Sequence, residues 1–300
     1  MEDNNSRLDV NYKDDIKSVD TIDGSIDHKD YDHKVYNHKV YNHKVYDHKA
    51  SICIPVYNNP DGLKKLLESI KSQTFKDYEV IVSDDSDAGH VELCKEITLS
   101  YSEHMTIRYI RHKSTGKPGD NWNSAISYAS GEYIKMMFHD DWFTDRLSLG
   151  RFVEVIDNSK AQCAFSGSIQ VSDDWRYARH IKNGDLELIK KDIRNLYVGN
   201  VIGAPSATIF RNKGIRFDNR LRWLIDMDYY LAAMIDEKDT IINTDEPLVS
   251  IGISDSQLTN YCRQHPGIVR REYLYVGRKY GLLGNTEYRK YLVSQLKKPH

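Results

Sequence analysis

The chain has 300 residues, and its 42 lysine and arginine residues nearly balance its 44 aspartate and glutamate residues. The formal net charge of −2 excludes a protein that binds nucleic acid through a global basic field. The four cysteines are widely spaced, without CxxC pairs or the density of a disulfide framework, and no apolar stretch reaches the roughly 18 residues of a membrane span. The polar N-terminus does not resemble a secretory signal, so we expect a reduced, cytoplasmic setting.

Residues 1–49 are polar and repetitive. From His28 to His48 a His-Lys pair recurs every five residues, with tyrosines between the pairs. This period matches neither the helical period of about 3.6 nor the strand period of about 2, so no apolar face forms and we expect a solvated low-complexity tail. A histidine-rich metal-binding tract is the alternative, although a lysine beside each histidine opposes cation binding. The repeat could also support self-association or tether a partner.

The segment from Ala50 to Trp142 alternates between β-branched apolar runs and amphipathic stretches. The expected strands are residues 51–56, 78–82, 106–111 and 133–138. The expected helices are residues 62–72, 88–101 and 121–130, and Gly131 is expected to close the last of them as the residue after its C-cap. This order predicts an α/β fold with a Rossmann-like, mainly parallel sheet flanked by helices.

Beyond Trp142 the pattern is more mixed. The expected helices are residues 144–157, 185–197 and 226–237, with two more helices between 267 and 296. The expected strands are residues 161–171, 205–211, 240–243 and 248–253. We therefore expect a smaller α+β part after residue 142 and a basic helical extension over residues 260–300.

Two acidic pairs, Asp84-Asp85 and Asp140-Asp141, directly follow expected parallel strands. They should converge on one rim of the sheet, where carboxylate oxygens suit Mg²⁺ or Mn²⁺. No GxxxxGK[ST] or GxGxxG motif follows the first strand, which disfavours a P-loop kinase and a dinucleotide enzyme. Such a rim suits a nucleotide diphosphate that is held through a metal ion. The alternative is an ordinary strand-to-helix turn in which Asp141 or a later residue caps a helix.

Three blocks of the chain resemble family 2 glycosyltransferases of the GT-A fold. The first is ICIPVYNNPDGLKKLLESIKSQTFKDYEVIVSDDSD, the second is GKPGDNWNSAISYASGEYIKMMFHDDW, and the third is FDNRLRWLIDMDYYLAAM. The likeness spans about residues 51–259. It implies a GT-A domain over residues 50–259, with a nucleotide-sugar half at 50–142 and an acceptor half at 143–259.

The resemblance implies a metal-dependent, inverting glycosyltransferase that uses Mn²⁺ or Mg²⁺. It implies a nucleotide diphosphate sugar as the donor, most often a UDP-sugar, and a hydroxyl of a glycan, lipid-linked or protein-linked acceptor. Carried over by position, Pro55, Tyr57, Asn58 and Asp85 should contact the nucleoside, and Asp140 should lie near the ribose.

The same resemblance implies that Asp141 binds the metal that bridges the diphosphate, and that Asp226 is the general base that deprotonates the acceptor hydroxyl. The family usually has glutamate where this chain has Ile225, so Asp228 could share the role and contact the acceptor.

Other positions depart from the family or leave two interpretations open. Many members have arginine where Asn121 stands, so contacts to the diphosphate could fall to Lys117. Many members also carry a histidine where this chain has Ser254. Trp223 could stack on an acceptor sugar or pack in the interior.

Three other functions remain as alternatives. A catalytically inactive, glycosyltransferase-like protein would bind nucleotide or glycan without turnover. A nucleotidyltransferase would need a glycine-rich basic loop after the first strand, which YNNPDG does not supply, and an interaction protein would act through its histidine repeat. The basic C-terminal stretch could contact an anionic membrane as a peripheral surface, or form a solvated helical face.

Overall fold

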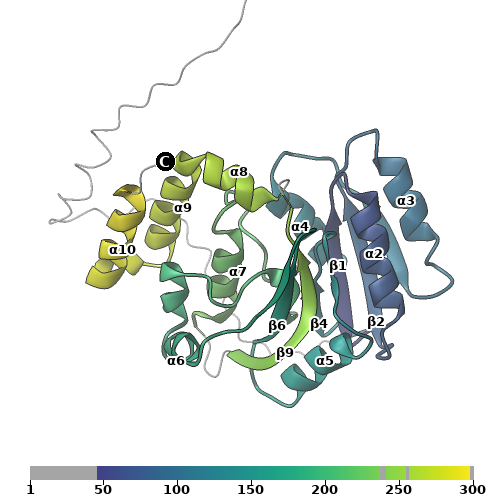
Figure 1. Cartoon of the computed structure of the whole chain (residues 1–300), viewed down its shortest axis with the longest axis horizontal. Helices are drawn as coiled ribbons and strands as arrows, with labels where there is room; N and C mark the ends of the chain where they lie inside the picture. Colours follow the sequence, from purple (N-terminus) through teal and green to yellow (C-terminus); the bar gives the residue numbers. More distant parts are fainter. Residues whose placement is uncertain (1–45, 237–240, 255–256, 298–300) are drawn as a thin grey trace, which may run out of the picture. The chain divides into compact units, whose positions relative to one another are not determined.

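The computed structural model describes residues 46–236, 241–254 and 257–297 (Figure 1). Within them, nine strands form one mixed sheet in the order β3-β2-β1-β4-β8-β6-β9-β5, and β7 pairs with β6. Most of the predicted low-complexity tail and of its histidine repeat lies outside the described residues. The order agrees with the predicted α/β class, and it places the first strand in the interior of the sheet.

The first four strands are parallel, as predicted. They are β1 (Ala50–Val56), β2 (Tyr78–Asp84), β3 (Ile107–Arg111) and β4 (Tyr133–Met136), linked by α2 (Pro60–Lys71), α3 (Val91–Leu99) and α4 (Pro118–Ser127). The chain adds β2 and β3 on one side of β1 and then crosses to add β4 on the other side. The strand order therefore reverses between β1 and β4, and in open α/β sheets ligands bind outside the carboxyl ends of strands at such a point.

The central strands β1, β2 and β4 are buried, and alternate side chains along β1 enter two apolar clusters on opposite faces of the sheet (Figure 1). In β1, Ile52 and Ile54 belong to the apolar cluster under α2, whereas Cys53 belongs to the cluster under α4 and α7 (Ile225–Met234). Helix α2 contributes its predicted apolar face to the first cluster. The two-residue period of the strand thus anchors two separate cores.

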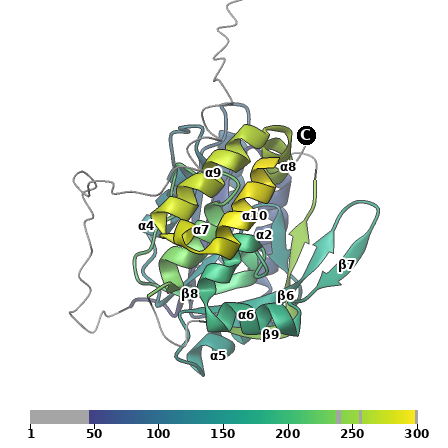
Figure 2. The same cartoon turned by 90° about the vertical axis from the view of Figure 1, so that its left-hand side faces the viewer.

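The second half of the sheet is mostly antiparallel. Its strands are β5 (Asp141–Phe143), β6 (Cys163–Val171), β7 (Arg176–Arg179), β8 (Thr208–Arg211) and β9 (Ile241–Gly252). Strand β9 runs parallel to β6 as one strand where two short strands were expected. The hairpin partner β7, which the sequence did not predict, extends from β6 (Figure 2).

Helices cover the rest of this half. They are α5 (Ser148–Asp157), α6 (Asn183–Lys191), α8 (Leu258–Gln264), α9 (Pro266–Lys279) and α10 (Thr286–Lys297), with 3₁₀ segments at Ile193–Val198, Pro205–Ala207 and Leu282–Gly284. The single helix expected over 185–197 is interrupted at Asp192, whose backbone is extended and whose side chain accepts a hydrogen bond from Arg194 N. Among the described residues, no helix combines the length and apolarity needed to cross a bilayer.

Gly131 is not the helix-terminating residue that the sequence predicted, because α4 already ends at Ser127. Its backbone nitrogen instead donates to Ser51 Oγ at 2.8 Å. A Cβ at Gly131 would lie 2.6 Å from Ser51 N, so glycine allows the close approach of this segment to β1.

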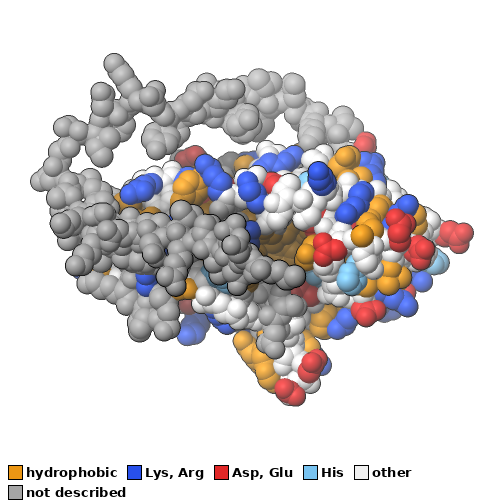
Figure 3. All heavy atoms as spheres, turned by 90° about the horizontal axis from the view of Figure 1, so that it is seen from above, with side chains coloured by type: hydrophobic (Ala, Val, Ile, Leu, Met, Phe, Trp, Pro, Cys, Tyr) orange, Lys and Arg blue, Asp and Glu red, His pale blue; other side chains and the backbone are white. Residues whose placement is uncertain are grey.

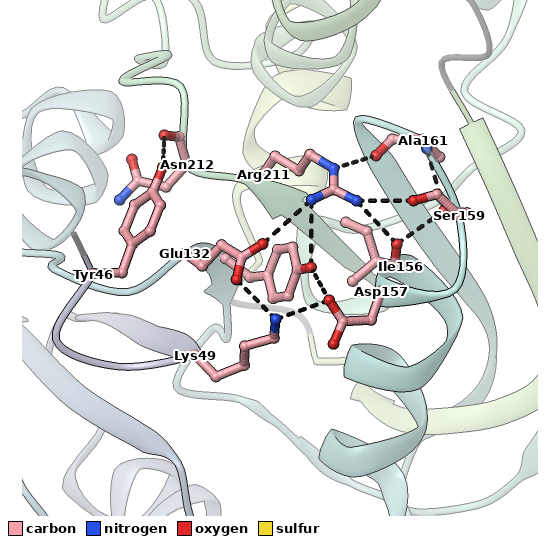
Figure 4. Close-up of polar contacts among 10 residues, drawn as sticks. Tyr46, Lys49, Glu132, Ile156, Asp157, Ser159, Ala161, Arg211 and Asn212 are labelled. Atoms are coloured by element: carbon pink, nitrogen blue, oxygen red, sulfur yellow. Dashed lines mark hydrogen bonds and ion pairs between the residues drawn. The ribbon is translucent and has the colours of Figure 1, made fainter. Parts of the chain in front are cut away.

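A polar network fixes the amino-terminal ends of β1 and β4 to α5 and β8 (Figure 4). The Lys49 ammonium lies 2.8 Å from both Glu132 and Asp157. The Tyr133 hydroxyl donates to Asp157, and the Arg211 guanidinium contacts Glu132 at 3.4 Å. Arg211 also donates to three backbone carbonyls in the turn that follows α5 and at its end. This network lies at the opposite ends of the strands from the acidic rim.

Candidate active site

The carboxyl end of β1 is bound to the end of β2 through one side chain. Asn121, in the first turn of α4, donates to the Val56 carbonyl at 3.1 Å and to Asp85 Oδ1 at 2.9 Å. Asp85 N donates to the same Val56 carbonyl at 3.2 Å. Asn121 is buried, and its Oδ1 has no hydrogen-bond partner among the described residues. The predicted site residues Asn121 and Asp85 are therefore brought together.

The two carboxylates of the first acidic pair differ in their surroundings. Asp84 accepts from Ser86 N at 2.8 Å and from the Tyr109 hydroxyl of β3 at 2.7 Å, so one oxygen holds the turn after β2 and the other is bound by the neighbouring strand. Burial raises the pKa of Asp85, and the nearby His112 and Ser114 oppose that shift. Of the two carboxylates, Asp85 is therefore the better candidate to bind a ligand, because both oxygens of Asp84 are already used within the fold.

The turn after β1 is held rigidly in an uncommon conformation. Asn58 has a φ of 49°, in the left-handed region, and its side chain exchanges two 2.8 Å hydrogen bonds with Asp87. Asn58 N donates to Ser86 Oγ at 2.8 Å. The Tyr57 side chain beside it is 48% exposed. An exposed ring on a fixed turn can stack on a nucleoside base, which is compatible with the nucleoside contact that the sequence predicted for Tyr57.

The loop between β4 and β5 approaches the same end of β1. His139 Nδ1 lies 3.2 Å from the Pro55 carbonyl. A Cβ at Gly62, in the first turn of α2, would lie 2.4 Å from the His139 carbonyl, so only glycine fits there. Pro55 itself is therefore a backbone contact point between β1 and the second acidic pair.

Asp141 begins strand β5 and does not cap a helix, whereas the later Asp145 accepts a hydrogen bond from Leu147 N just before α5, so the alternative interpretation is wrong for Asp141 itself. Its Oδ1 accepts from Gly252 N at 3.2 Å. Burial raises the pKa of Asp141 well above its usual value, and the adjacent Asp140 adds to that shift, while hydrogen bonds from Ser206 and Gly252 oppose it. Asp140 is more exposed, and its Oδ2 lies 3.4 Å from Gln257 Nε2.

A buried lysine, which was not predicted from the sequence as a site residue, lies close to this pair. Lys135, in β4, is fully buried and donates to the Ser206 and Met136 carbonyls. Burial lowers the pKa of Lys135 to about 7, whereas the charge of Asp141 opposes that shift. The signal available in the sequence was the single charged residue inside the apolar run YIKMMF.

The donor set at Asp140 and Asp141 fits a divalent cation. The charge of Asp140 contributes to the raised pKa of Asp141, and a hard cation between the two carboxylates would relieve their repulsion. Within the described ranges, no three histidine, cysteine, aspartate or glutamate side chains gather as a ready metal site. Mg²⁺ commonly takes only one or two carboxylates together with substrate phosphates and water, so two aspartates suffice for that type of site.

Asp226 lies in the first turn of α7 and is partly exposed. Its Oδ1 is buried and has no hydrogen-bond partner among the described residues, and burial raises the pKa of Asp226 to about 7. The neighbouring Ile225 reaches the first turn of α4, where its Cδ1 would lie 3.3 Å from a Cβ at Gly119. The amino-terminal turns of α4 and α7 therefore meet, and they carry Asn121 and Asp226 respectively.

Two of the predicted residues do not join this group. Asp228 is fully buried, and both of its carboxylate oxygens accept from Lys279 Nζ, at 2.7 and 2.8 Å. Its carboxylate is committed to joining α7 to α9, so an acceptor contact through it is inconsistent with this structure. Trp223 is half-buried and packs against the apolar cluster under α7.

Lys117 is exposed at the N-cap of α4. Its ammonium has no hydrogen bond or ion pair among the described residues, so it is available to a ligand at the start of α4.

A second residue that was not predicted from the sequence holds the loop before α7. Glu272, on α9, is buried and accepts hydrogen bonds from the backbone nitrogens of Arg222, Trp223 and Leu224 at 2.9, 2.8 and 2.9 Å. These are the donors that precede a helix start and would otherwise be unsatisfied. Glu272 therefore positions the segment that leads into Asp226.

Comparisons with known proteins agree with this geometry. A family model described as glycosyl transferase family 2 matches residues 51–217. An uncharacterized glycosyltransferase of Rickettsia typhi is 27% identical over 221 residues, which make up 70% of this chain. The match covers 65% of that protein, so the chain spans less than two thirds of its length.

Two solved structures have the same fold at low sequence identity. S. aureus TarS 1–349 in complex with UDP-GlcNAc has a TM-score of 0.59 and 17% identity, covering 83% of this chain and 79% of that chain. A mannosyltransferase of Pyrobaculum calidifontis in complex with GDP-Man and Mn²⁺ has a TM-score of 0.57 and 13% identity, covering 78% and 66%.

Proposed function

This chain belongs to glycosyl transferase family 2 and has the predicted GT-A fold, and from that premise we propose that it transfers a sugar from a nucleotide diphosphate sugar to an acceptor hydroxyl. The transfer is a single displacement with inversion. The acceptor oxygen forms a bond to the anomeric carbon while the bond from that carbon to the diphosphate oxygen breaks, and the hydroxyl proton passes to a carboxylate.

The nucleoside binds at the carboxyl ends of β1 and β2 in this proposal. The exposed Tyr57 ring stacks on the base, and the Asp85 carboxylate accepts a hydrogen bond from it. Asn121 supports this arrangement because it holds Asp85 against the end of β1. UDP is the proposed nucleotide, and the UDP-GlcNAc complex of the S. aureus neighbour supports that choice, although the second neighbour was solved with GDP-Man.

Asp140 and Asp141 hold the diphosphate end of the donor. A bound Mn²⁺ or Mg²⁺ would neutralise the charge of the leaving diphosphate. Asp141 is the proposed metal ligand and Asp140 lies toward the ribose, with Gly252 N and Ser206 fixing the Asp141 carboxylate. Lys117, at the start of α4, is available to the same diphosphate.

Asp226 is the proposed general base, and its surroundings carry the proposal. A carboxylate in water has a pKa near 4 and is a weak base, whereas burial raises that of Asp226 to about 7. A base with a pKa near the working pH combines adequate basicity with an adequate deprotonated fraction. Asp226 is partly exposed, so an acceptor hydroxyl can approach its carboxylate and pass its proton to it.

The decisive experiment measures binding and slow hydrolysis of UDP-, GDP- and dTDP-sugars, with and without Mn²⁺, for the wild type and Asp141→Ala. We expect one donor to be hydrolysed in a metal-dependent reaction that Asp141→Ala abolishes. Asp173→Ala, which removes an exposed aspartate after β6, is the matched control and should behave as the wild type. The proposal is wrong if no nucleotide sugar binds in the presence of metal.

A further inference from the structure

A pocket of about 470 Å³ opens between the loop before α7 and the helices α8 and α9. Three arginines line it, Arg220 and Arg222 from the loop and Arg271 from α9, and Tyr261 and Tyr275 contribute aromatic walls. None of these residues has a role in the donor site proposed above. The pocket is therefore a second concave surface, and arginine dominates its charge.

The three guanidinium groups are not equivalent. Arg220 is neutralised, since its Nε and Nη2 each lie 2.8 Å from an oxygen of Asp218. Arg222 donates instead to the Gly116 carbonyl at 2.7 Å, and Arg271 donates to the Gly267 carbonyl at 3.2 Å. Within the part of the chain that the structure describes, neither Arg222 nor Arg271 forms an ion pair with a carboxylate.

The acidic residue of the pocket lining does not satisfy these arginines. Glu272 is 5% exposed and accepts three backbone hydrogen bonds, from Arg222, Trp223 and Leu224. Burial raises the pKa of Glu272, and the nearby positive charge of Arg222 opposes that rise. The guanidinium nitrogens of Arg222 and Arg271, however, keep donors that no carboxylate accepts, and such groups favour an anion.

The position of the pocket ties it to the reaction centre. Arg222 lies on the loop that leads into Asp226, and the Gly116 carbonyl to which it donates precedes Lys117. Figure 3 shows the molecule from above the view of Figure 1, which is the side on which α8 and α9 lie. Lysine and arginine side chains gather on the part of that face left visible by the grey atoms.

We propose that this pocket binds a phosphate group of the acceptor, so that the acceptor is a hydroxylated molecule that carries phosphate. Planar guanidinium groups match phosphate oxygens with paired N–H donors, and the tyrosine rings offer contact area for the organic part of the molecule. The assignment to the acceptor rests on the proposed function. The other source of the same chemistry is the donor diphosphate, and the experiment separates the two.

The test measures binding of inorganic pyrophosphate to the full chain in metal-free buffer, by titration calorimetry, in the presence of saturating UDP. We expect binding to the wild type that weakens roughly tenfold or more in Arg222→Gln/Arg271→Gln, since hydrogen bonds to charged groups are of that strength. Arg271→Lys should give an intermediate loss, because it keeps the charge without the paired donors. Arg151→Gln, an exposed arginine of α5 paired with Glu246, should bind as the wild type.

Equal binding by the wild type and the double variant would overturn the proposal, and so would complete displacement of pyrophosphate by UDP, which would place the anion in the donor site. Arg271→Gln alone changes an exposed side chain, so it tests the same point if the double variant fails to fold. If arginine-dependent binding is found but no nucleotide sugar binds, the phosphate pocket stands and the donor proposal fails. If a nucleotide sugar is turned over but pyrophosphate binding does not depend on the arginines, the donor proposal stands and the phosphate pocket fails.

Discussion

The Glu272 carboxylate of α9 accepts a hydrogen bond from Trp223 N at 2.8 Å, although 49 residues separate the two in sequence. Together with its bonds to Arg222 N and Leu224 N, this contact fixes the loop from which α7 begins. The start of α7 carries Asp226. Helix α9 therefore supports the segment that carries Asp226, the proposed general base.

We expect Glu272→Gln to unfold more easily than the wild type, by about 1–3 kcal/mol, because it brings an amide donor toward three backbone donors. Donor hydrolysis should fall as well, since the loop before Asp226 loses its anchor. Urea unfolding and hydrolysis assays check both effects. Glu287→Gln, an exposed glutamate of α10 in a surface pair with Lys290, is the control and should change stability by less than about 0.5 kcal/mol. A Glu272→Gln protein as stable as the control would contradict the anchoring role.

Asp226→Asn should retain nucleotide-sugar binding and lose transfer, because asparagine cannot take the acceptor proton. In the wild type, the rate should rise with pH through about 7, since the base acts only when it is deprotonated and burial raises its pKa to about 7. A pH–rate profile measured between pH 5.5 and about 8.5 checks this expectation. A profile that is flat across this range would remove Asp226 from the role of base.

The same pKa predicts a change in stability. The folded pKa of Asp226 lies above its unfolded value, so the folded protein binds the extra proton between about pH 4 and 7, and stability falls as the pH rises across that window. Asp226→Asn should therefore be more stable than the wild type at pH 8, by about 1–3 kcal/mol, and the difference should shrink toward pH 4. Denaturation midpoints at the two pH values measure it, and Asp173→Asn should show no such pH dependence. An Asp226→Asn protein that is less stable than the wild type at pH 8 would contradict the buried, unpartnered carboxylate.

The fold of residues 50–142 was predictable because its signals are local. The strand 51–56 and the helix after Pro60 each carry their own period, and the paired aspartates stand directly after strands. The sequence also predicted that Asp84-Asp85 and Asp140-Asp141 lie at one rim of the sheet, and the parallel pairing of β1 with β2 and β4 agrees with that placement.

The rest depended on partners distant in sequence. Asp228 looked like a second acceptor-side carboxylate, but Lys279, 51 residues away, binds it in the interior. Lys135 gains its buried acceptor from Ser206, 71 residues away. No local pattern encodes such pairings, because they appear only when the strands and helices have been packed together.

The network around Arg211 should matter for stability more than for activity. Its guanidinium donates to the carbonyls of Ala161, Ser159 and Ile156 at 2.9, 2.9 and 3.2 Å. Lysine cannot reach three acceptors at once, so Arg211→Lys should lose about 2–3 kcal/mol of unfolding free energy. Arg151→Lys, at an exposed pair with Glu246, should lose almost none. Equal urea midpoints for the two variants would show that the network contributes little.

A glycine substitution before β4 tests how closely that segment approaches β1, and a second glycine substitution in α6 is its control. Gly131→Ala would place a Cβ 2.6 Å from Ser51 N, where backbone must move, so we expect a loss of about 2 kcal/mol or more. Gly184→Ala adds the same methyl group in the first turn of α6, where no atom beyond the adjacent residues and the helix backbone lies within 4 Å. There we expect a gain of about 0.5–1 kcal/mol, because alanine favours the helix. Urea unfolding of both variants should therefore give changes of opposite sign, and a stable Gly131→Ala protein would show that the segment does not approach β1 this closely.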